Sequence, residues 1–142
     1  LHRAVHILVR NRNGEFFLQK RSMSKDTHPG AWDSSSAGHL DAGEGYDEAA
    51  VRELEEELGL SPATAGPMQY LFKLDASPAT DEEFLHVYRI ENEGPFTLQA
   101  SEIECGDWFS ADKITQWIAE SPGDFPPAFM LVWKIYNERY SQ

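Results

Sequence analysis

A cluster of acidic residues between positions 44 and 57 has the spacing of a metal site. This stretch holds seven acidic side chains and one basic side chain, Arg52. On an α-helix, Glu53, Glu56 and Glu57 lie on one face at the spacing i, i+3, i+4. Carboxylates this close repel one another, and a counter-charge would relieve that cost. A hard divalent cation, which prefers oxygen ligands, is the obvious candidate.

The residues around these carboxylates predict the helix that presents them. Residues 49–58 are mostly good helix formers and contain neither proline nor glycine. Gly59 then provides a C-terminal stop, because glycine readily adopts the left-handed conformation that ends many helices. Val51, Leu54 and Leu58 form a different face of the same helix, which we expect to pack against the core.

The stretch from Gly38 to Leu60 also resembles a known signature, the Nudix box, G-x5-E-x7-R-E-U-x-E-E-x-G-U, in which U is apolar. All nine specified positions match, namely Gly38, Glu44, Arg52, Glu53, Leu54, Glu56, Glu57, Gly59 and Leu60. The alternative interpretation, a solvated acidic helix, leaves the two glycines, the arginine and the distant Glu44 unexplained. The chain is therefore identified by resemblance as a member of the Nudix hydrolase superfamily.

The resemblance implies a role for each polar residue of this signature. The implied metal ligands are Glu53, Glu56 and Glu57, one of which could also serve as the base. Glu44 would support the cluster from the preceding loop. Arg52 would orient the carboxylates, and a simple surface salt bridge is its alternative role. Gly38 and Gly59 would let the backbone approach a neighbour or turn.

The implied activity is Mg²⁺-dependent hydrolysis of the diphosphate linkage in a nucleoside diphosphate joined to another group, or in a related compound. A diphosphate is anionic and repels nucleophiles. Mg²⁺ neutralises its oxygens, can activate water and aligns the attacking and leaving oxygens. Mn²⁺ could replace Mg²⁺. The expected partner is thus a small-molecule diphosphate, and a homodimer is a further family expectation.

Outside the signature, the chain resembles isopentenyl-diphosphate isomerase and its hydrolase-like relatives. The similar segments are residues 2–4, 19–25, 29–32 and 38–39, with weaker similarity at 83–88, 108 and 125–127. By this resemblance Arg21 and Lys25 would bind the diphosphate, although composition alone would favour an ordinary basic loop. Gly38, His39 and Glu83 become further candidates for the metal site, and a hydrogen-bonded structural role is the alternative for His39.

Two departures from the isomerase favour a hydrolase. The isomerase has a cysteine where this chain has Ala37, and its Nudix box is degraded, whereas the box here is complete. Allylic isomerisation needs an acid and a base across a double bond, and Ala37 can supply neither. The isomerase remains one alternative, and a non-catalytic diphosphate-binding module is another. The complete set of glutamates counts against the second alternative.

Composition limits the other function classes. At 142 residues the chain is expected to form one domain over residues 1–142. Its net charge of −12 argues against a general nucleic-acid or membrane-surface binder. No apolar run approaches the roughly 18 residues of a membrane span. Cys105 is the only cysteine, so no intrachain disulfide can form, and we expect a cytoplasmic location.

Hydrophobic patterning predicts the elements that surround the acidic helix. Strands are expected at residues 4–9 and 16–19, joined as a hairpin, and at 68–74 and 83–90. Ser110 should N-cap a helix that extends to Trp117, and Pro127 should begin a last helix with a core-facing stripe of Phe129, Val132, Trp133 and Tyr136. These elements predict an α/β protein with a mixed sheet. The Nudix resemblance implies an α/β/α sandwich with the loop-helix of the box at its centre.

Overall fold

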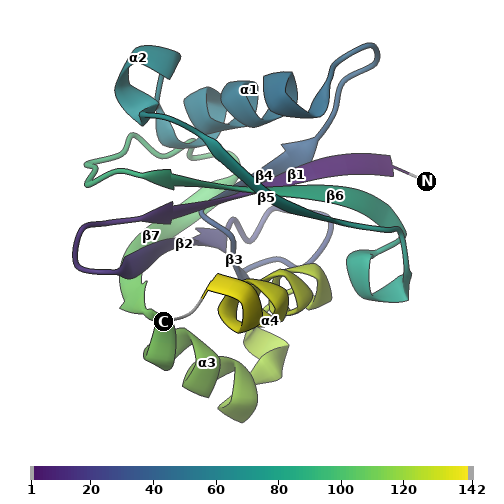
Figure 1. The fold of residues 1–142 in the computed structure, drawn as a ribbon. Coiled ribbons are helices and arrows are strands. Elements are labelled where there is room, and N and C mark those ends of the chain that lie inside the picture. The colour runs from purple at the N-terminus through teal and green to yellow at the C-terminus, as the bar shows by residue number, and fades with distance from the viewer. Residues whose placement is uncertain (1, 141–142) are drawn as a thin grey trace.

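A computed structural model describes residues 2–140 and contains the expected alternation of strands and helices (Figure 1). Its strands are β1 (His2–Arg10), β2 (Glu15–Arg21), β3 (Trp32–Asp33), β4 (Ser36–His39), β5 (Gln69–Leu74), β6 (Glu83–Glu91) and β7 (Ile103–Ser110). Its helices are α1 (Tyr46–Leu58), α2 (Pro62–Ala65), α3 (Ala111–Glu120) and α4 (Pro127–Tyr140), with short 3₁₀ turns η1 (Pro78–Thr80) and η2 (Pro122–Asp124). No helix within the described residues is long and apolar enough to span a bilayer.

The strands form one seven-stranded mixed sheet with β1 at its centre. The main order is β3-β2-β1-β6-β5, with β4 paired to β1 and β7 paired to β2. β1 runs parallel to β6 along its whole length, and its other partners are antiparallel. On its other edge β1 pairs with β4 from Ala4 to Ile7 and with β2 only at Val9 and Arg10. The sheet therefore forks beside β1, and β4 occupies one branch.

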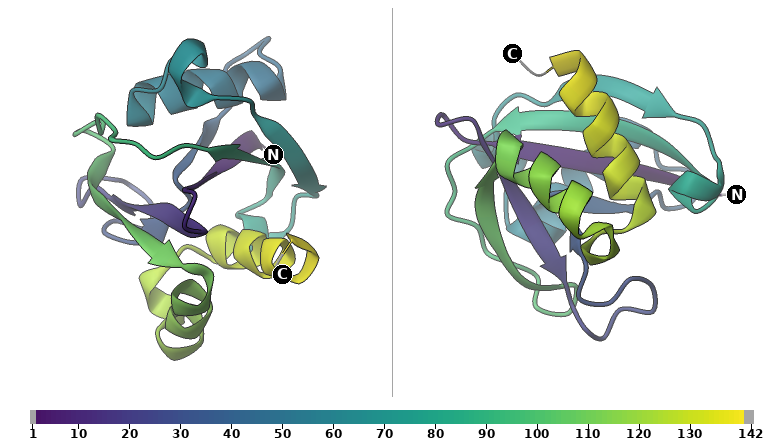
Figure 2. Two further views of the ribbon diagram at one scale, coloured as in Figure 1. Left: turned by 60° about the vertical axis from the view of Figure 1, so that its left-hand side comes forward. Right: turned by 90° about the horizontal axis from the view of Figure 1, so that it is seen from below.

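Helices cover both faces of the sheet, which confirms the expected α/β/α sandwich. α1 and α2 lie on one face and α3 and α4 on the other (Figures 1 and 2). Successive side chains of a strand point to opposite faces of the sheet, so β1 contributes residues to the core on each face. Val5, Ile7 and Val9 pack in the core beneath α1. Ala4 and Leu8 pack in the core beneath α4.

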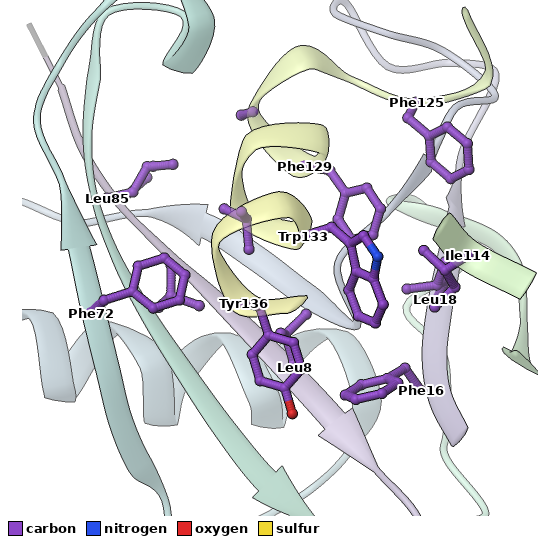
Figure 3. Packing of buried hydrophobic residues seen from close by; sticks show 14 residues of the cluster. Leu8, Phe16, Leu18, Phe72, Leu85, Ile114, Phe125, Phe129, Trp133 and Tyr136 are labelled. Carbon is purple, nitrogen blue, oxygen red and sulfur yellow. The ribbon is translucent and has the colours of Figure 1, made fainter. Parts of the chain in front are cut away.

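The core beneath α4 is built mainly from aromatic rings (Figure 3). The predicted stripe of Phe129, Val132, Trp133 and Tyr136 is fully or almost fully buried. Phe16 meets the rings of Trp133 and Tyr136 edge-to-face, at centroid distances of 5.0 and 5.4 Å. This geometry is the favourable one for aromatic pairs and fixes α4 against the sheet.

The buried face of α1 differs from the sequence prediction. Val51 was expected in the core, but its side chain is 37% exposed. At about 100° per residue, the buried residues of α1 fill an arc of about 180°. These residues are Ala49, Ala50, Glu53, Leu54, Glu57 and Leu58. Glu57 lies near the middle of this arc, so two of the glutamates belong to the buried face rather than to a separate one.

Two further segments differ from the prediction, whereas the predicted N-cap of α3 is confirmed. Residues 62–65 form a short helical turn that was not predicted. β7 was not predicted, because it is an edge strand with charged side chains, and so it lacks the alternation of a half-buried strand. The expected N-cap is present, since the backbone N–H of Lys113 donates to Ser110 Oγ at 3.1 Å.

We expect the Phe129→Ala substitution to lower the free energy of unfolding by about 3–5 kcal/mol, because it removes a fully buried ring. The matched control is Val51→Ala, which should change stability by no more than about 0.5 kcal/mol. Urea denaturation followed by circular dichroism measures both values. A large loss in the Val51 variant would contradict its exposed position.

Candidate active site

One oxygen of Glu57 ties the acidic helix to the sheet. Glu57 Oε1 accepts hydrogen bonds from Ser36 Oγ at 2.9 Å, from the backbone N–H of Ala37 at 3.1 Å and from Gln19 Nε2 at 3.1 Å. The donors come from β2, which contains Gln19, and from β4, which begins with Ser36 and Ala37. The side chain of Glu57 is therefore buried, and the three hydrogen bonds to Oε1 hold it in place. Its second oxygen faces Glu53.

Glu53 occupies the space that Gly38 leaves open. A Cβ atom built on Gly38 would lie only 2.3–2.6 Å from the carboxyl atoms of Glu53. Real Cβ atoms do not approach other atoms this closely, so any larger residue here must displace Glu53. The first glycine of the box is thus explained by close approach of a side chain and not by an unusual backbone angle. Gly59 is required for its backbone angle instead, because it ends α1 in the left-handed conformation with φ 72°.

Burial strongly affects the protonation of the two inner carboxyls. Burial raises the pKa of Glu53. Burial also raises the pKa of Glu57 well above its ordinary value, and the adjacent charge of Glu53 raises it further. Without a cation, the two buried carboxyls therefore hold a proton more tightly than free carboxyls do. A bound cation would favour the loss of that proton.

Arg52 forms hydrogen bonds to three of the carboxylates that it was expected to orient. Its guanidinium bonds to both oxygens of Glu44 at 2.8 and 3.0 Å, and this contact lowers the pKa of Glu44 to about 2. Its Nη1 also donates to Glu53 at 2.6 Å and to Glu56 at 3.0 Å. Its Nη2 donates to the backbone carbonyl of His39 at 2.9 Å. Arg52 thus joins the loop, the helix and β4, which is more than a simple surface salt bridge.

A cleft of about 540 Å³ opens beside this cluster and collects most of the predicted site residues. Those that line it are Arg21, Lys25, Gly38, His39, Arg52, Glu53, Glu57 and Glu83. Glu44 and Glu56 are not part of its wall, because Glu44 lies behind Arg52 and Glu56 lies on the outer side of α1. Eight of the predicted site residues thus line one cleft, and the other two lie outside its lining.

The two predicted diphosphate-binding residues already have partners in the cleft. Arg21 donates to the backbone carbonyls of Thr27 and His28 at 2.8–3.2 Å and pairs with Asp33 at 3.4 Å. Lys25 Nζ forms an ion pair with Glu102. Arg21 holds the loop that follows β2, and Lys25 is the more accessible positive charge for an incoming anion.

His39 and Glu83 lie together because β1 pairs with both of their strands. His39 is the register partner of Ala4, and Glu83 is the register partner of His2. The His39 Nε2 atom is hydrogen-bonded to Glu83, and this contact raises the pKa of His39. The ring of His39 also lies 5.5 Å from the ring of His2. The hydrogen-bonded role and a metal-site role are both compatible with this position.

The chemistry of the carboxyl cluster fits a hard divalent cation. Glu53, Glu56 and Glu57 offer oxygen atoms, and the two buried carboxyls repel each other unless a proton or a cation intervenes. In the part of the chain that the structure describes, no three acidic, histidine or cysteine side chains already converge as a metal-ligand set. Arg52 bridges Glu53 and Glu56 instead, so cation binding would replace one of these contacts.

Sequence reasoning missed several polar residues that support the site. Gln19, Ser36 and Asp33 are buried, and the first two bond to Glu57. His6 is also buried and lines the cleft. A buried polar side chain needs a partner, so polar residues inside apolar strand patterns were the available signal. No residue type alone could show which partner each one has.

Comparison with known proteins finds relatives that span the whole site. Residues 1–129 match the family model described as the NUDIX domain. An uncharacterised Nudix hydrolase of Yersinia pestis is 35% identical over 139 residues, which is 97% of this chain and 74% of the relative. An isopentenyl-diphosphate Delta-isomerase of Streptomyces avermitilis is 33% identical over 93% of this chain and 68% of the relative. A crystal structure of a Deinococcus radiodurans protein matches with a TM-score of 0.81 at 28% identity, over 98% of this chain and 83% of that one.

We expect Gly38→Ala to weaken Mn²⁺ binding by about 10- to 100-fold, the range for disturbing the groups that orient metal ligands. The added methyl group must displace the Glu53 carboxyl. Gly45→Ala is the matched control, because Gly45 has a negative φ of −85° and its new methyl would meet only the flexible Glu48 side chain. Calorimetric titration with Mn²⁺ measures both affinities. Equal affinities in the two variants would contradict the close-packing argument.

We expect Glu57→Gln to make the metal-free protein more stable than the native protein at pH 8. Folding raises the pKa of Glu57, so the folded state binds its proton more tightly than the unfolded state does. Stability of the native protein therefore falls as the pH rises above the ordinary carboxyl value of 4.5 towards the raised one. Glutamine carries no charge, and it replaces the repulsion from Glu53 with an amide donor.

The measurement is urea denaturation in EDTA at pH 5 and pH 8. The difference between the variant and the native protein should shrink towards pH 5, because a larger fraction of the native pair is protonated there. A Glu57→Gln variant that is less stable than the native protein at pH 8 would contradict the raised pKa.

Proposed function

The chain belongs to the Nudix hydrolase family, and on that basis we propose that it cleaves a diphosphate linkage in a nucleoside diphosphate joined to another group, with a divalent cation as cofactor. The main support is the carboxyl cluster of α1, which is fixed on β4 and opens onto a cleft with cationic side chains. A structural role alone would not need two buried carboxyls that repel each other.

The metal ligands in this proposal are Glu53, Glu56 and Glu57. When bound, Mg²⁺ would neutralise the diphosphate oxygens and lower the pKa of an attacking water. Glu57 suits a fixed ligand, because three donors already hold its Oε1. Arg52 keeps Glu53 aimed across Gly38, and Glu44 keeps Arg52 in place.

Glu56 also suits the role of the base, for which it would turn from the outer side of α1 towards the cleft. Its side chain is half exposed, and in the described structure its hydrogen bond is to Arg52. It can therefore move towards a water molecule and accept a proton, whereas Glu57 cannot move without breaking three hydrogen bonds. Removal of that proton would make the water a better nucleophile at phosphorus.

The opposite wall of the cleft would bind the diphosphate. Lys25 can exchange its partner Glu102 for a phosphate oxygen, since both partners are partly exposed and the exchange replaces one ion pair by another. Arg21 would act mainly by holding the loop that carries Lys25, because its guanidinium is bonded to backbone carbonyls of that loop. The diphosphate would then lie between this basic loop and the glutamates.

Position 37 supports hydrolysis over isomerisation, despite the isomerase among the relatives. Ala37 lines the cleft next to Gly38, and its methyl group can neither donate nor accept a proton. Cys105 lies exposed on β7 and is absent from the lining of the cleft, so it cannot replace a thiol there. A binding module without catalysis would have no use for a mobile Glu56 beside a fixed Glu57.

We expect phosphate release from at least one compound in a panel of nucleotide sugars, dinucleotides, nucleoside triphosphates and isoprenoid diphosphates with Mg²⁺. A coupled phosphatase assay provides the measurement. Glu56→Gln should lower kcat by at least about a hundredfold, as expected for an acid-base group. The control is Glu55→Gln, because Glu55 is exposed on the same helix and outside the cleft.

Four outcomes would contradict the proposal. Full activity in EDTA would exclude the cation, and full activity of the Glu56 variant would exclude the base. Deuterium exchange from solvent into dimethylallyl diphosphate, followed by NMR with isopentenyl diphosphate as substrate, would identify an isomerase. Tight binding of panel compounds without any turnover would instead identify a binding module.

A further inference from the structure

A buried histidine that the hydrolytic residues do not use lies in the wall of the cleft. His6 belongs to β1, and only 5% of its surface is exposed. It is the register partner of Ala37 on β4, so the two side chains lie on the same face of the sheet. Its Nδ1 atom lies 2.8 Å from Ser34 Oγ. Neither the carboxyl cluster nor the basic loop includes it.

The contact with Ser34 determines which ring nitrogen carries the proton. Ser34 is fully buried, and among the described residues its hydroxyl contacts only His6 Nδ1. A buried hydroxyl without an acceptor is unfavourable, so Ser34 donates its proton to Nδ1. Burial also lowers the pKa of His6, which keeps the ring neutral. The remaining hydrogen is therefore on Nε2.

The Nε2–H group of His6 points to the cleft. Within residues 2–140, every side-chain nitrogen or oxygen that is fully buried has a hydrogen-bond partner. His6 Nε2 has no protein partner among these residues, so it must reach the solvent-accessible space, and the cleft is the space that His6 lines. The wall thus presents one neutral donor that the protein itself leaves free.

The surroundings of this donor favour an uncharged acceptor. Ala4, Ala37 and Ala128 line the same cleft and leave room for a ligand group. Asp33 and Glu83 are the negative charges that act on His6, and they disfavour a second anion beside it. Arg21 and His39 are the positive groups nearby, and each is already paired with one of these two carboxylates.

We propose that His6 determines specificity by donating an Nε2–H hydrogen bond to an uncharged oxygen or ring nitrogen of the nucleoside part of the substrate. This proposal rests on the proposed function, because it assumes that a phosphate group lies between the basic loop and the glutamates. A hydrocarbon group in the same place would leave the donor unpaired, so the site should reject it.

Two substitutions separate this role from a merely structural one. In His6→Asn, the side-chain amide reaches the position of Nδ1, keeps an acceptor for Ser34 and removes the donor in the cleft. In His6→Gln, the amide NH₂ reaches the position of Nε2 and keeps the donor, but the contact with Ser34 is lost. A structural role predicts that the glutamine variant is the more damaged one, and the proposed role predicts the reverse for ligand binding.

The test uses ligands that cannot be hydrolysed at a diphosphate. NMR titrations with Mg²⁺ measure the Kd of AMP, CMP, GMP, UMP, isopentenyl monophosphate and inorganic phosphate. We expect at least one nucleotide to bind the native protein more tightly than phosphate does. His6→Asn should reduce that advantage by about three- to tenfold, the effect of one hydrogen bond, and His6→Gln should keep it within about twofold.

Several results would overturn the proposal. These are no nucleotide preferred over phosphate, a preference for isopentenyl monophosphate, or an unchanged nucleotide advantage in a folded His6→Asn variant. If that variant does not fold, long-range ¹H–¹⁵N spectra of the native protein still decide, because a proton on Nδ1 instead of Nε2 contradicts the argument. Since no turnover is measured, a protein that binds nucleotides in this way without hydrolysing diphosphates would overturn only the proposed function.

Discussion

The burial of two carboxyl groups beneath α1 is the constraint on which the rest of the site depends. Glu53 and Glu57 lie in the arc of the helix that would otherwise be apolar, so each needs partners in the sheet. Glu57 finds three donors from β2 and from the stretch around β4, and Glu53 finds a space above Gly38 and a charge on Arg52. The helix is therefore held to the sheet by polar contacts near the middle of its buried face and by apolar residues on both sides of them.

β1 makes this arrangement accessible to a ligand. Because it exchanges β2 for β4 along one edge, the sheet opens on the side where α4 begins, and the cleft extends from the carboxyl cluster to the first residues of that helix. The same strand brings β4 and β6 next to each other through opposite edges. Acidic groups, imidazoles and a basic loop from segments far apart in the sequence thus meet around one strand.

Most helices and strands, and the acidic residues of the candidate site, could be predicted from the sequence. The buried partners of those acidic residues could not. The spacing of the box residues predicted α1 and its end at Gly59, because local periodicity determines these features. The resemblance implied the orienting role of Arg52, and the guanidinium does contact Glu44, Glu53 and Glu56. Periodicity could not show that Glu53 and Glu57 share the buried face with Leu54, since a carboxyl there is stable only with partners distant in sequence, such as Gln19. β7 was missed for a related reason, because an edge strand with charged residues has no buried face to produce alternation. His6 stands in an apolar run, and only the pairing with Ser34 distinguishes it from a core residue.

The parallel pairing of β1 with β6 has a consequence for how the chain acquires its structure. Register partners in this pair, such as Arg10 and Glu91, are 81 residues apart. Contacts of such long range require closure of a large loop and slow the folding of a domain. During synthesis, the central strand leaves the ribosome long before its parallel neighbour exists, and only the hairpin with β2 and the pairing with β4 can form early. The acidic helix can thus dock on β4 in a partly made protein, whereas the cleft takes its final shape only when the last third of the sheet and α4 have been added.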